Sequence, residues 1–326
     1  MTLFRILLIL IVSWSMIGQA GADMTFFDLT HEIPTFKPKP SPDGATRPLP
    51  DLLQPIKHST PIAGFYPQAV LYPGDKFYTS DGYFLSRAIV IEEHNGTHLD
   101  STNHYINNAA SLEPGSNPND QRKSAEQLTI EQLTGKIVLI DVSERVKKEL
   151  AKNKGIPSPD ILVTDFSNTS QATVRASDIE SVADQIKDGV WVIARVGWDK
   201  FYYDGIEDWA TSSYVNNFNH PGFTPEAIEK LIEIMDRKKV KISGIAADSW
   251  STDSGEGAKG IDDNYTKAWQ VHVRLYQRNI LVVESLASLK ELANAYRKND
   301  DCYLMVGGLK QVGGTGGPAR VMAACK

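Results

Sequence analysis

The sequence predicts a single mixed α/β domain, and three observations support this fold class. Continuous apolar runs of strand length, typical of strands that are buried on both faces, occur at residues 136–142, 190–196 and 240–247. Stretches with helix start signals alternate with these runs. The composition is that of a soluble globular protein, since 41% of the 326 residues are hydrophobic and 23% are charged.

The N-terminus has the features of a secretory signal peptide. Arg5 precedes an apolar run at residues 6–17, and a small-residue cleavage site ends at Ala22. A membrane anchor is the alternative, but this run is too short to span a bilayer comfortably. We therefore expect a secreted or periplasmic protein with a signal peptide at 1–22, a mature domain at 23–326 and no membrane attachment after cleavage.

The next part of the chain is expected to contain two strands and two long irregular segments. Residues 26–33 form the first strand, which Pro34 ends. The Pro-rich segment 34–73 is expected to be a surface excursion that covers a site. Residues 83–91 are predicted as a strand that leads into residues 94–104. Residues 106–123 are predicted as a loop.

Helix signals recur in the rest of the chain. Ser177 is predicted to cap a helix that reaches about Lys187, because Glu180 follows it by three residues. Thr224 and Pro225 begin another helix with an apolar face. The remaining predictions are helices at 143–154 and 267–278, strands at 280–283 and 303–306, and a Gly-rich turn at 313–319 before a terminal helix.

Charge and cysteine content limit the function classes. The formal net charge of −6 disfavours nonspecific binding to nucleic acid or to anionic lipid. The two cysteines, Cys302 and Cys325, are both near the C-terminus. A disulfide in an exported protein and two buried free thiols are equally compatible with this spacing.

A histidine-rich segment carries the clearest chemical signal. Three imidazoles and one carboxylate occur together, at His94, His98, Asp100 and His104. Gly96 disfavours a helix here, whereas an extended backbone would project residues 98, 100, 102 and 104 to one side as a single wall. Imidazole and carboxylate without thiolate are the ligand set of a borderline divalent cation such as Zn²⁺ or Mn²⁺. We therefore predict a metal site with one or two ions.

This segment resembles the His-x-Gly-Thr-His-x-Asp-x-Pro-x-His signature of the metal-dependent cyclase family, which includes bacterial kynurenine formamidases and isatin hydrolases. Every position matches except Thr102, which stands in place of the proline. The loss of that proline is expected to loosen the loop that carries His104. A second match begins at Asp248, where family members read Asp-Thr-Pro-Ser-Ile-Asp and this chain has Trp250 in place of the proline.

The resemblance implies a swivelling β/β/α fold, that is, an α/β single domain with a mixed sheet, and a homo-oligomer, here expected to be a homodimer or homotetramer. It also implies that His272 on a helix and Glu284 at the end of the following strand complete the metal site. His104 is expected to act as general acid and base, and a role as a further ligand is the alternative. The expected metal ligands are His94, His98, Asp100, His272 and Glu284.

Metal chemistry is favoured because the chain has no Gly-x-Ser-x-Gly motif and neither cysteine has a plausible His nearby. A metal provides both an activated water and an electrophile, which favours hydrolysis of an amide, imide or lactone carbonyl. Kynurenine formamidases and isatin hydrolases open aromatic amides, so the resemblance implies a small aromatic amide substrate. The residues expected to contact it are Phe84, Trp198, Trp250 and Ser251, with plain core packing as the alternative for the aromatic side chains.

The leading hypothesis is therefore an exported metal-dependent hydrolase that opens a cyclic or aryl amide or imide similar to isatin or N-formylkynurenine. A lactone hydrolase is a close alternative. A catalytically inactive binding protein of the same fold would hold metal without turnover. An isomerase or dehydratase would form product without taking up oxygen from labelled water.

Overall fold

The structure, a computed structural model, describes residues 24–33, 91–104, 122–152, 154–157, 172–204, 212–216, 219–255 and 269–326, together with five short strands between residues 35 and 90. The expected signal peptide and most of the segments 34–73 and 106–123 lie outside the described residues. No helix in the described part of the chain combines the length and the apolar character needed to cross a bilayer.

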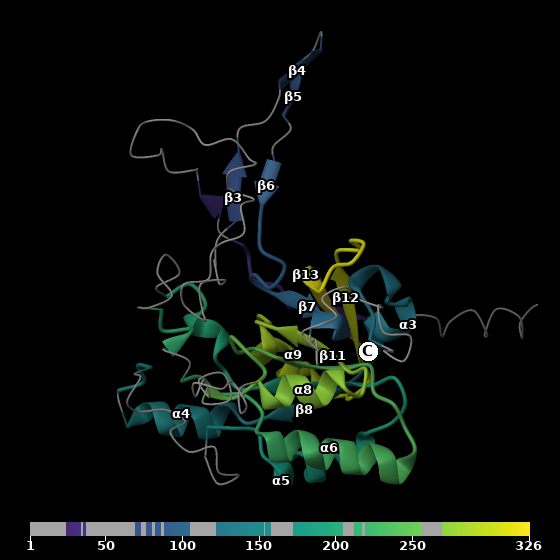
Figure 1. Cartoon of the computed structure of the whole chain (residues 1–326). Helices are drawn as coiled ribbons and strands as arrows, with labels where there is room; N and C mark the ends of the chain where they lie inside the picture. Colours follow the sequence, from purple (N-terminus) through teal and green to yellow (C-terminus); the bar gives the residue numbers. More distant parts are fainter. Residues whose placement is uncertain are drawn as a thin grey trace, which may run out of the picture.

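Four parallel strands form the centre of the fold (Figure 1). Each pairs with the next along the sheet, and each matches an apolar run that the sequence predicts as a strand, so these predictions are confirmed. Apolar residues on both faces suit strands that are covered on both sides. The four are β8 (Thr134–Asp141), β9 (Trp191–Arg195), β10 (Gly244–Ala247) and β11 (Leu281–Glu284).

Antiparallel strands close this sheet into a barrel. β7 (His98–Asp100) pairs with β11, and the first residues of β13 (Gly316–Cys325) pair with β7. The rest of β13 pairs with β12 (Cys302–Gly308), which pairs with β8 and completes the ring. β1 (Thr25–Asp28) pairs with the last residues of β13. The mixed sheet and the α/β fold class are therefore as the sequence analysis expects.

Two apolar clusters lie on opposite faces of the parallel strands. Val192 and Ala194 of β9 belong to the cluster beneath the helices, whereas Trp191 and Ile193 belong to the cluster inside the barrel. In Figure 1 the helices α4, α5, α6 and α8 lie along one side of the barrel. The helices are α3 (Ile130–Leu133), α4 (Ser143–Ala151), α5 (Ala176–Ser181), α6 (Pro225–Lys238), α8 (Gln270–Tyr276) and α9 (Leu289–Tyr296), with short 3₁₀ turns η1 (Thr102–His104), η2 (Ala125–Gln127), η3 (Ala183–Gln185) and η4 (Asp199–Phe201).

The start of α6 is confirmed, whereas the predicted start and end of α5 are wrong. The Thr224 hydroxyl accepts a hydrogen bond from the Ala227 amide at 3.1 Å, directly before Pro225. In α5 the Asp178 carboxylate accepts the Arg175 amide hydrogen at 2.9 Å, which makes Arg175 the capping position instead of Ser177. The helix ends at Ser181 and a 3₁₀ turn takes the chain onward.

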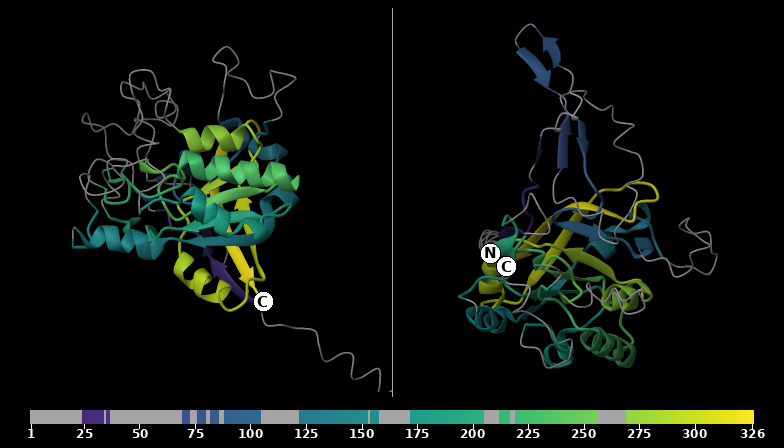
Figure 2. Two further views of the ribbon diagram at one scale, coloured as in Figure 1. Left: turned by 90° about the horizontal axis from the view of Figure 1, so that it is seen from below. Right: turned by 60° about the vertical axis from the view of Figure 1, so that its left-hand side comes forward.

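The predicted strand at 83–91 is wrong, because the chain divides there into two strands that belong to different small sheets. β4 (Lys76–Thr79) pairs with β5 (Gly82–Leu85), and β3 (Ala69–Tyr72) pairs with β6 (Ala88–Val90) and with β2 (Thr35–Phe36). Figure 1 and the right view of Figure 2 show β3 to β6 standing away from the barrel. The histidine segment instead forms a barrel strand of its own, β7.

The predicted terminal helix is also wrong, since these residues form β13. Side chains alternate along this strand, with Val321 and Ala323 fully buried and Met322 exposed between them. Gly316 makes the close pairing with β7 possible, because a Cβ there would lie 2.5 Å from the Leu99 carbonyl oxygen. The Gly-rich segment therefore serves strand pairing and does not lead into a helix.

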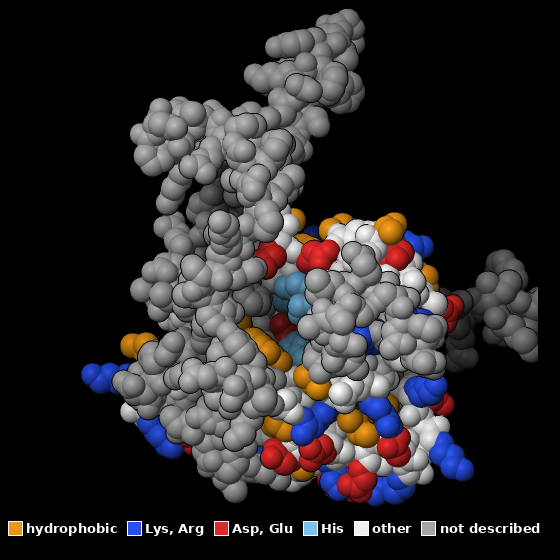
Figure 3. Space-filling view, in the orientation of Figure 1, with side chains coloured by type: hydrophobic (Ala, Val, Ile, Leu, Met, Phe, Trp, Pro, Cys, Tyr) orange, Lys and Arg blue, Asp and Glu red, His pale blue; other side chains and the backbone are white. Residues whose placement is uncertain are grey.

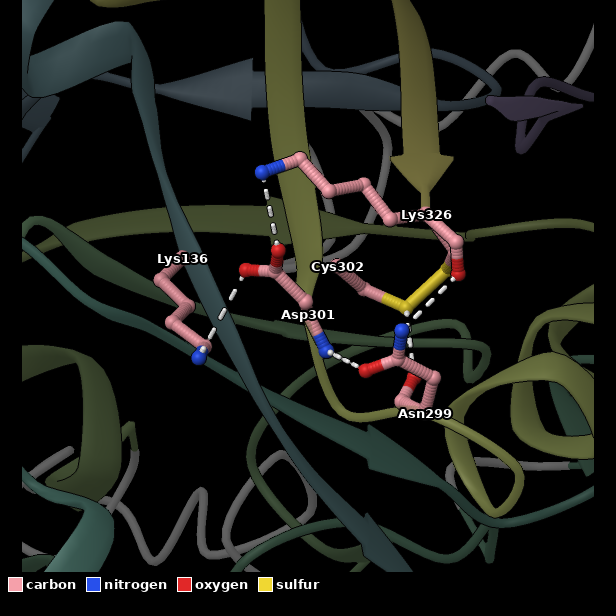
Figure 4. Close-up of a disulfide and its surroundings, with 6 residues drawn as sticks. Lys136, Asn299, Asp301, Cys302 and Lys326 are labelled. Carbon is pink, nitrogen blue, oxygen red and sulfur yellow. Dashed lines mark hydrogen bonds and ion pairs between the residues drawn. A yellow bond between two sulfur atoms is a disulfide. The ribbon is translucent and has the colours of Figure 1, made fainter. Parts of the chain in front are cut away.

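A disulfide joins the two strands at the C-terminus. Cys302 and Cys325 lie opposite each other in the register of β12 and β13 and are bonded. Figure 4 shows Asp301 next to the bond, paired with Lys136 at 3.7 Å and with Lys326 at 3.1 Å. Of the two alternatives that the spacing left open, the structure shows the disulfide.

Replacing both cysteines by serine, C302S/C325S, is expected to lower the free energy of unfolding by about 3 kcal/mol, because the bond closes a loop with a sequence separation of 23 residues. Urea unfolding without reductant measures this difference. The wild type treated with dithiothreitol serves as the control and should unfold near the midpoint of the variant. Equal unfolding midpoints for the oxidised wild type and the variant would contradict the prediction.

Candidate metal centre

The five residues expected to bind metal converge at one end of β7 and β11. His98 lies opposite Glu284 in the register of these strands, and Asp100 lies further along β7. His94 precedes β7, and His272 lies on α8, which packs against β11. Figure 3 shows histidine side chains and a carboxylate in a hollow on this face of the molecule. The donor atoms form two groups, each within 4.8 Å, that share Asp100: His94, Asp100 and His104, and His98, Asp100 and Glu284.

His98 is buried, and its hydrogen bonding directs Nε2 at two carboxylates. The Nδ1 atom lies 2.8 Å from the Gly96 carbonyl oxygen. Because a carbonyl only accepts, Nδ1 carries a proton, and Nε2 is the nitrogen that can bind a cation in place of its own proton. Nε2 has no hydrogen-bond partner among the described residues, and it lies 3.3 Å from Asp100 Oδ1 and 3.6 Å from Glu284 Oε2. Three potential ligand atoms thus face one another, which is the arrangement that a cation stabilises.

His94 reaches the same carboxylate with its other ring nitrogen. The Thr315 hydroxyl donates to Glu93, so at 3.0 Å it accepts a hydrogen bond from His94 Nε2–H. The other ring nitrogen, Nδ1, lies 2.6 Å from Asp100 Oδ1 and donates its hydrogen to this carboxylate when no cation is bound. Glu93 and Thr315 together orient this imidazole toward the centre.

Asp253 orients His272 in a similar way. Its carboxylate accepts the His272 Nδ1–H at 2.5 Å and also accepts the amide hydrogens of Val271 and His272 at the start of α8. His272 Nε2 then lies 3.1 Å from Glu284 Oε1. Asp253 therefore combines helix capping with the orientation of a functional imidazole.

Hydrogen bonds also fix both carboxylates. Glu284 Oε1 accepts from the Ser251 hydroxyl at 3.0 Å and from the amide and hydroxyl of Thr252 at 2.6 and 3.1 Å. Asp100 Oδ2 accepts from the Tyr276 hydroxyl at 2.8 Å. These bonds fix both carboxylates so that Asp100 Oδ1 faces His94 and His98, and Glu284 Oε2 faces His98.

The pKa shifts at this centre show that its buried carboxylates favour a positive charge next to them. Burial by itself lowers the pKa of His98, but Asp100, with Glu284, outweighs burial and raises it to about 9, so without a cation Nε2 is protonated at pH 7. Burial raises the pKa of Asp100, yet the charges of His94 and His98 hold it well below its usual range. His272 likewise outweighs burial and lowers the pKa of Glu284. Both carboxylates stay ionised, and their nitrogen and oxygen donors fit a borderline divalent cation.

His104 arrives at the centre by a turn and not by strand alternation. The extended backbone ends at Asp100, and η1 then turns the chain, so the predicted wall of four residues holds only for His98 and Asp100. The His104 ring stacks on His94 with centroids 3.9 Å apart. Desolvation, followed by the charge of His94, lowers the pKa of His104 to about 3, so the ring is neutral at pH 7 although part of the residue reaches the surface.

The loop before His104 is held, contrary to the expectation that Thr102 loosens it. The Thr102 hydroxyl accepts the Lys123 amide hydrogen at 2.9 Å and donates to Asn279 Oδ1 at 3.3 Å. Proline would have limited the backbone through its ring. Threonine instead attaches the loop to two other segments by hydrogen bonds.

Of the four residues expected to contact substrate, Trp198 and Ser251 have other roles in the structure, the Phe84 side chain is not described, and Trp250 lies near the centre. Trp198 is fully buried and donates its indole N–H to the Tyr214 carbonyl at 2.7 Å, so the structure places it in the core. Ser251 holds Glu284. The side chain of Phe84 lies outside the described residues. Trp250 does lie near the centre, because its ring is 6.2 Å from Trp269, which meets the His272 ring edge-on at 5.7 Å.

Sequence reasoning missed the residues that orient the ligands. Tyr276 follows His272 by four residues, so a helical face shared with a predicted ligand was a usable signal. Thr252 lies inside a recognised motif, but its position gave no sign that it bonds to Glu284. Thr315 had no local signal at all, because it is 221 residues from His94.

Tyr276→Phe is expected to weaken metal affinity about 10-fold to 100-fold, because it removes a hydrogen bond that orients Asp100. A competition titration with a chelator measures this affinity. Tyr296→Phe is the matched control, since the Tyr296 hydroxyl bonds to Gln185 at the surface. Equal metal affinity in both variants would show that the Tyr276 hydroxyl does not support the centre.

Comparison with known proteins agrees with this geometry. Residues 27–254 match a family model described as "Putative cyclase". An isatin hydrolase from Roseibium aggregatum is 30% identical over 247 residues, which are 76% of this chain and 77% of that protein. The chain belongs to the cyclase family, and within it this chain is a hydrolase with a site for a divalent metal ion.

Solved structures extend the likeness to almost the whole chain. An isatin hydrolase bound to the product analogue thioisatinate is 25% identical, with a TM-score of 0.58 and coverage of 96% of this chain and 97% of that one. Isatin hydrolase A from Labrenzia aggregata, bound to benzyl benzoate, is 22% identical, with a TM-score of 0.59 and coverage of 96% and 98%. The second likeness concerns the fold alone.

Proposed function

We propose that this protein is an exported hydrolase that opens a cyclic or aryl amide or imide, with one divalent cation, Zn²⁺ or Mn²⁺, held by His94, His98, Asp100 and Glu284. The main support is the hydrogen bonding of the two histidines. One N–H of each ring is committed to a neighbour, so that the other nitrogen, His94 Nδ1 or His98 Nε2, faces Asp100 Oδ1 and can exchange its proton for a cation. The relationship to isatin hydrolases supports the substrate class.

The grouping of the donor atoms favours one ion over two. Among the described residues, both groups of side chains that could hold a metal ion contain Asp100, and neither contains His272. We therefore assign His272 to the vicinity of the reacting atoms and not to a second ion.

A bound cation would lower the pKa of a water molecule and polarise the substrate carbonyl. The neutral His104 ring would accept the proton of the attacking water and return it to the leaving nitrogen. Aromatic side chains border the centre, with Tyr276 6.1 Å from His104 and Trp269 5.7 Å from His272. Flat apolar walls of this kind suit an aromatic substrate.

Metal analysis of the purified protein, combined with a screen of isatin, N-formylkynurenine and simple lactones, tests the proposal. We expect about one ion per chain, hydrolysis of an aromatic amide, and loss of both in His98→Ala. Bound metal without turnover of any compound would favour the inactive binding protein. Turnover of lactones alone would favour the lactone hydrolase, and product without labelled oxygen would favour an isomerase or dehydratase.

Export and self-association complete the proposal. The signal-like residues 1–22 support a secreted or periplasmic location, and the family resemblance supports a homodimer or homotetramer. N-terminal sequencing after expression with an export pathway should show cleavage after Ala22. Light scattering should give the mass of two or four chains, and a monomer would reject the second expectation.

A further inference from the structure

His220 is a buried histidine near the metal centre, and it is not one of the proposed metal ligands. It is 0% exposed. Its chain segment is joined to the segment after β10 by backbone hydrogen bonds, from Phe223 to the Thr252 carbonyl at 2.7 Å and from Gly255 to the His220 carbonyl at 2.8 Å. Thr252 bonds to Glu284. The backbone of His220 is thus fixed relative to the metal centre.

The ring of His220 lies against the aromatic wall of the site. It meets the Trp250 ring edge-on, with centroids 5.2 Å apart. Trp250 in turn lies 6.2 Å from Trp269, which meets His272. The charges of Glu284 and Asp253 are close enough to act on His220. His220 therefore lies on the Trp250 side of the centre, where an aromatic substrate would be held.

The hydrogen bonding of His220 leaves one acceptor unused. Nδ1 lies 3.3 Å from the Pro221 carbonyl oxygen, to which it donates, so Nε2 carries a lone pair. This atom is buried and has no hydrogen-bond partner among the described residues. Burial lowers the pKa of the ring to about 4, so it stays neutral at pH 7. A buried acceptor without a donor is costly, so a bound molecule that offers an N–H or O–H group at this position would remove this cost.

We propose that His220 is a substrate-orienting residue, whose Nε2 accepts a hydrogen bond from the N–H group of the amide or imide substrate. This inference rests on the proposed function. A neutral acceptor pairs with an N–H and disfavours an oxygen that can only accept in the same place. It therefore selects an amide over the lactone of the same shape, because the lactone has oxygen where the amide has N–H.

Isatin and N-methylisatin test this role, since they differ in the N–H group. In the metal-loaded His104→Gln variant, in which catalysis is expected to be slow, isatin is expected to bind about tenfold more tightly than N-methylisatin by calorimetry, as one hydrogen bond to a neutral acceptor implies. His220→Phe should remove this preference without changing the metal content. His220→Gln should restore part of it, because the Gln side-chain oxygen is an acceptor.

His31→Phe is the matched control, because His31 is also buried, has an unpartnered Nε2 and stacks on Tyr202 at 3.8 Å. It should keep the preference for isatin. Equal binding of both compounds by the His104→Gln protein, or a preference that persists when His220→Phe is added to it, would overturn the assignment. Absence of metal or of turnover in the wild type would instead reject the proposed function, since the binding preference is measured in a variant with slow catalysis.

Discussion

Asp100→Asn is expected to abolish metal retention and turnover, the largest effect that the structure predicts for one substitution. Asp100 Oδ1 lies between His94 Nδ1 and His98 Nε2, at 2.6 and 3.3 Å. Asparagine keeps the shape but removes the negative charge and places an amide group at the centre. Loss of a residue that only orients a ligand costs about 10-fold to 100-fold in metal affinity, so loss of this ligand should cost more than about 100-fold.

Elemental analysis after dialysis and a chelator titration measure this loss. Asp141→Asn is the matched control, because Asp141 pairs with Arg195 at 2.9 Å and with Arg297 at 2.7 Å away from the metal centre. It should retain a full complement of metal. Equal metal content in the two variants would remove Asp100 from the proposed site.

His104→Gln is expected to lower kcat by about 10²-fold to 10⁴-fold while metal content stays unchanged. The neutral imidazole stacks on His94 at 3.9 Å, next to the proposed metal site, and glutamine cannot exchange a proton at neutral pH. Steady-state kinetics with the substrate found in the screen measure kcat and KM separately. We expect KM to change far less than kcat.

The same variant separates the two roles proposed for His104. Its donor atom also lies within 4.8 Å of those of His94 and Asp100, which suits a ligand. Metal loss together with activity would identify His104 as a ligand and reject its role as general acid and base. An unchanged kcat would exclude both roles.

Local sequence patterns were sufficient to predict many of the strands and helices of the fold. The four parallel strands follow from continuous apolar runs, because strands buried on both faces need apolar residues at every position. Thr224 and Pro225 identified the start of α6, since capping depends on residues within one turn. The same reasoning failed for Ser177, where the Asp178 carboxylate reaches back to Arg175, and for β13, whose pairing partners lie far away in the sequence.

Two tryptophans show which properties of the site could not be predicted from the sequence. Trp198 and Trp250 are equally good candidates for substrate contact in the sequence, but only Trp250 lies beside His220 and near His272. Trp198 is enclosed in the core and bonds to Tyr214. Burial depends on every neighbouring element, so no local pattern separates these two residues.

The sequence by itself determined the chemistry of the donors: three histidines and an aspartate within eleven positions of the chain define a ligand set regardless of how the rest folds. The tertiary structure alone decided which ring nitrogen each histidine presents to the centre. That choice depends on the partner of the opposite nitrogen, and Thr315 for His94 and Asp253 for His272 come from distant segments that only barrel closure and helix packing bring near.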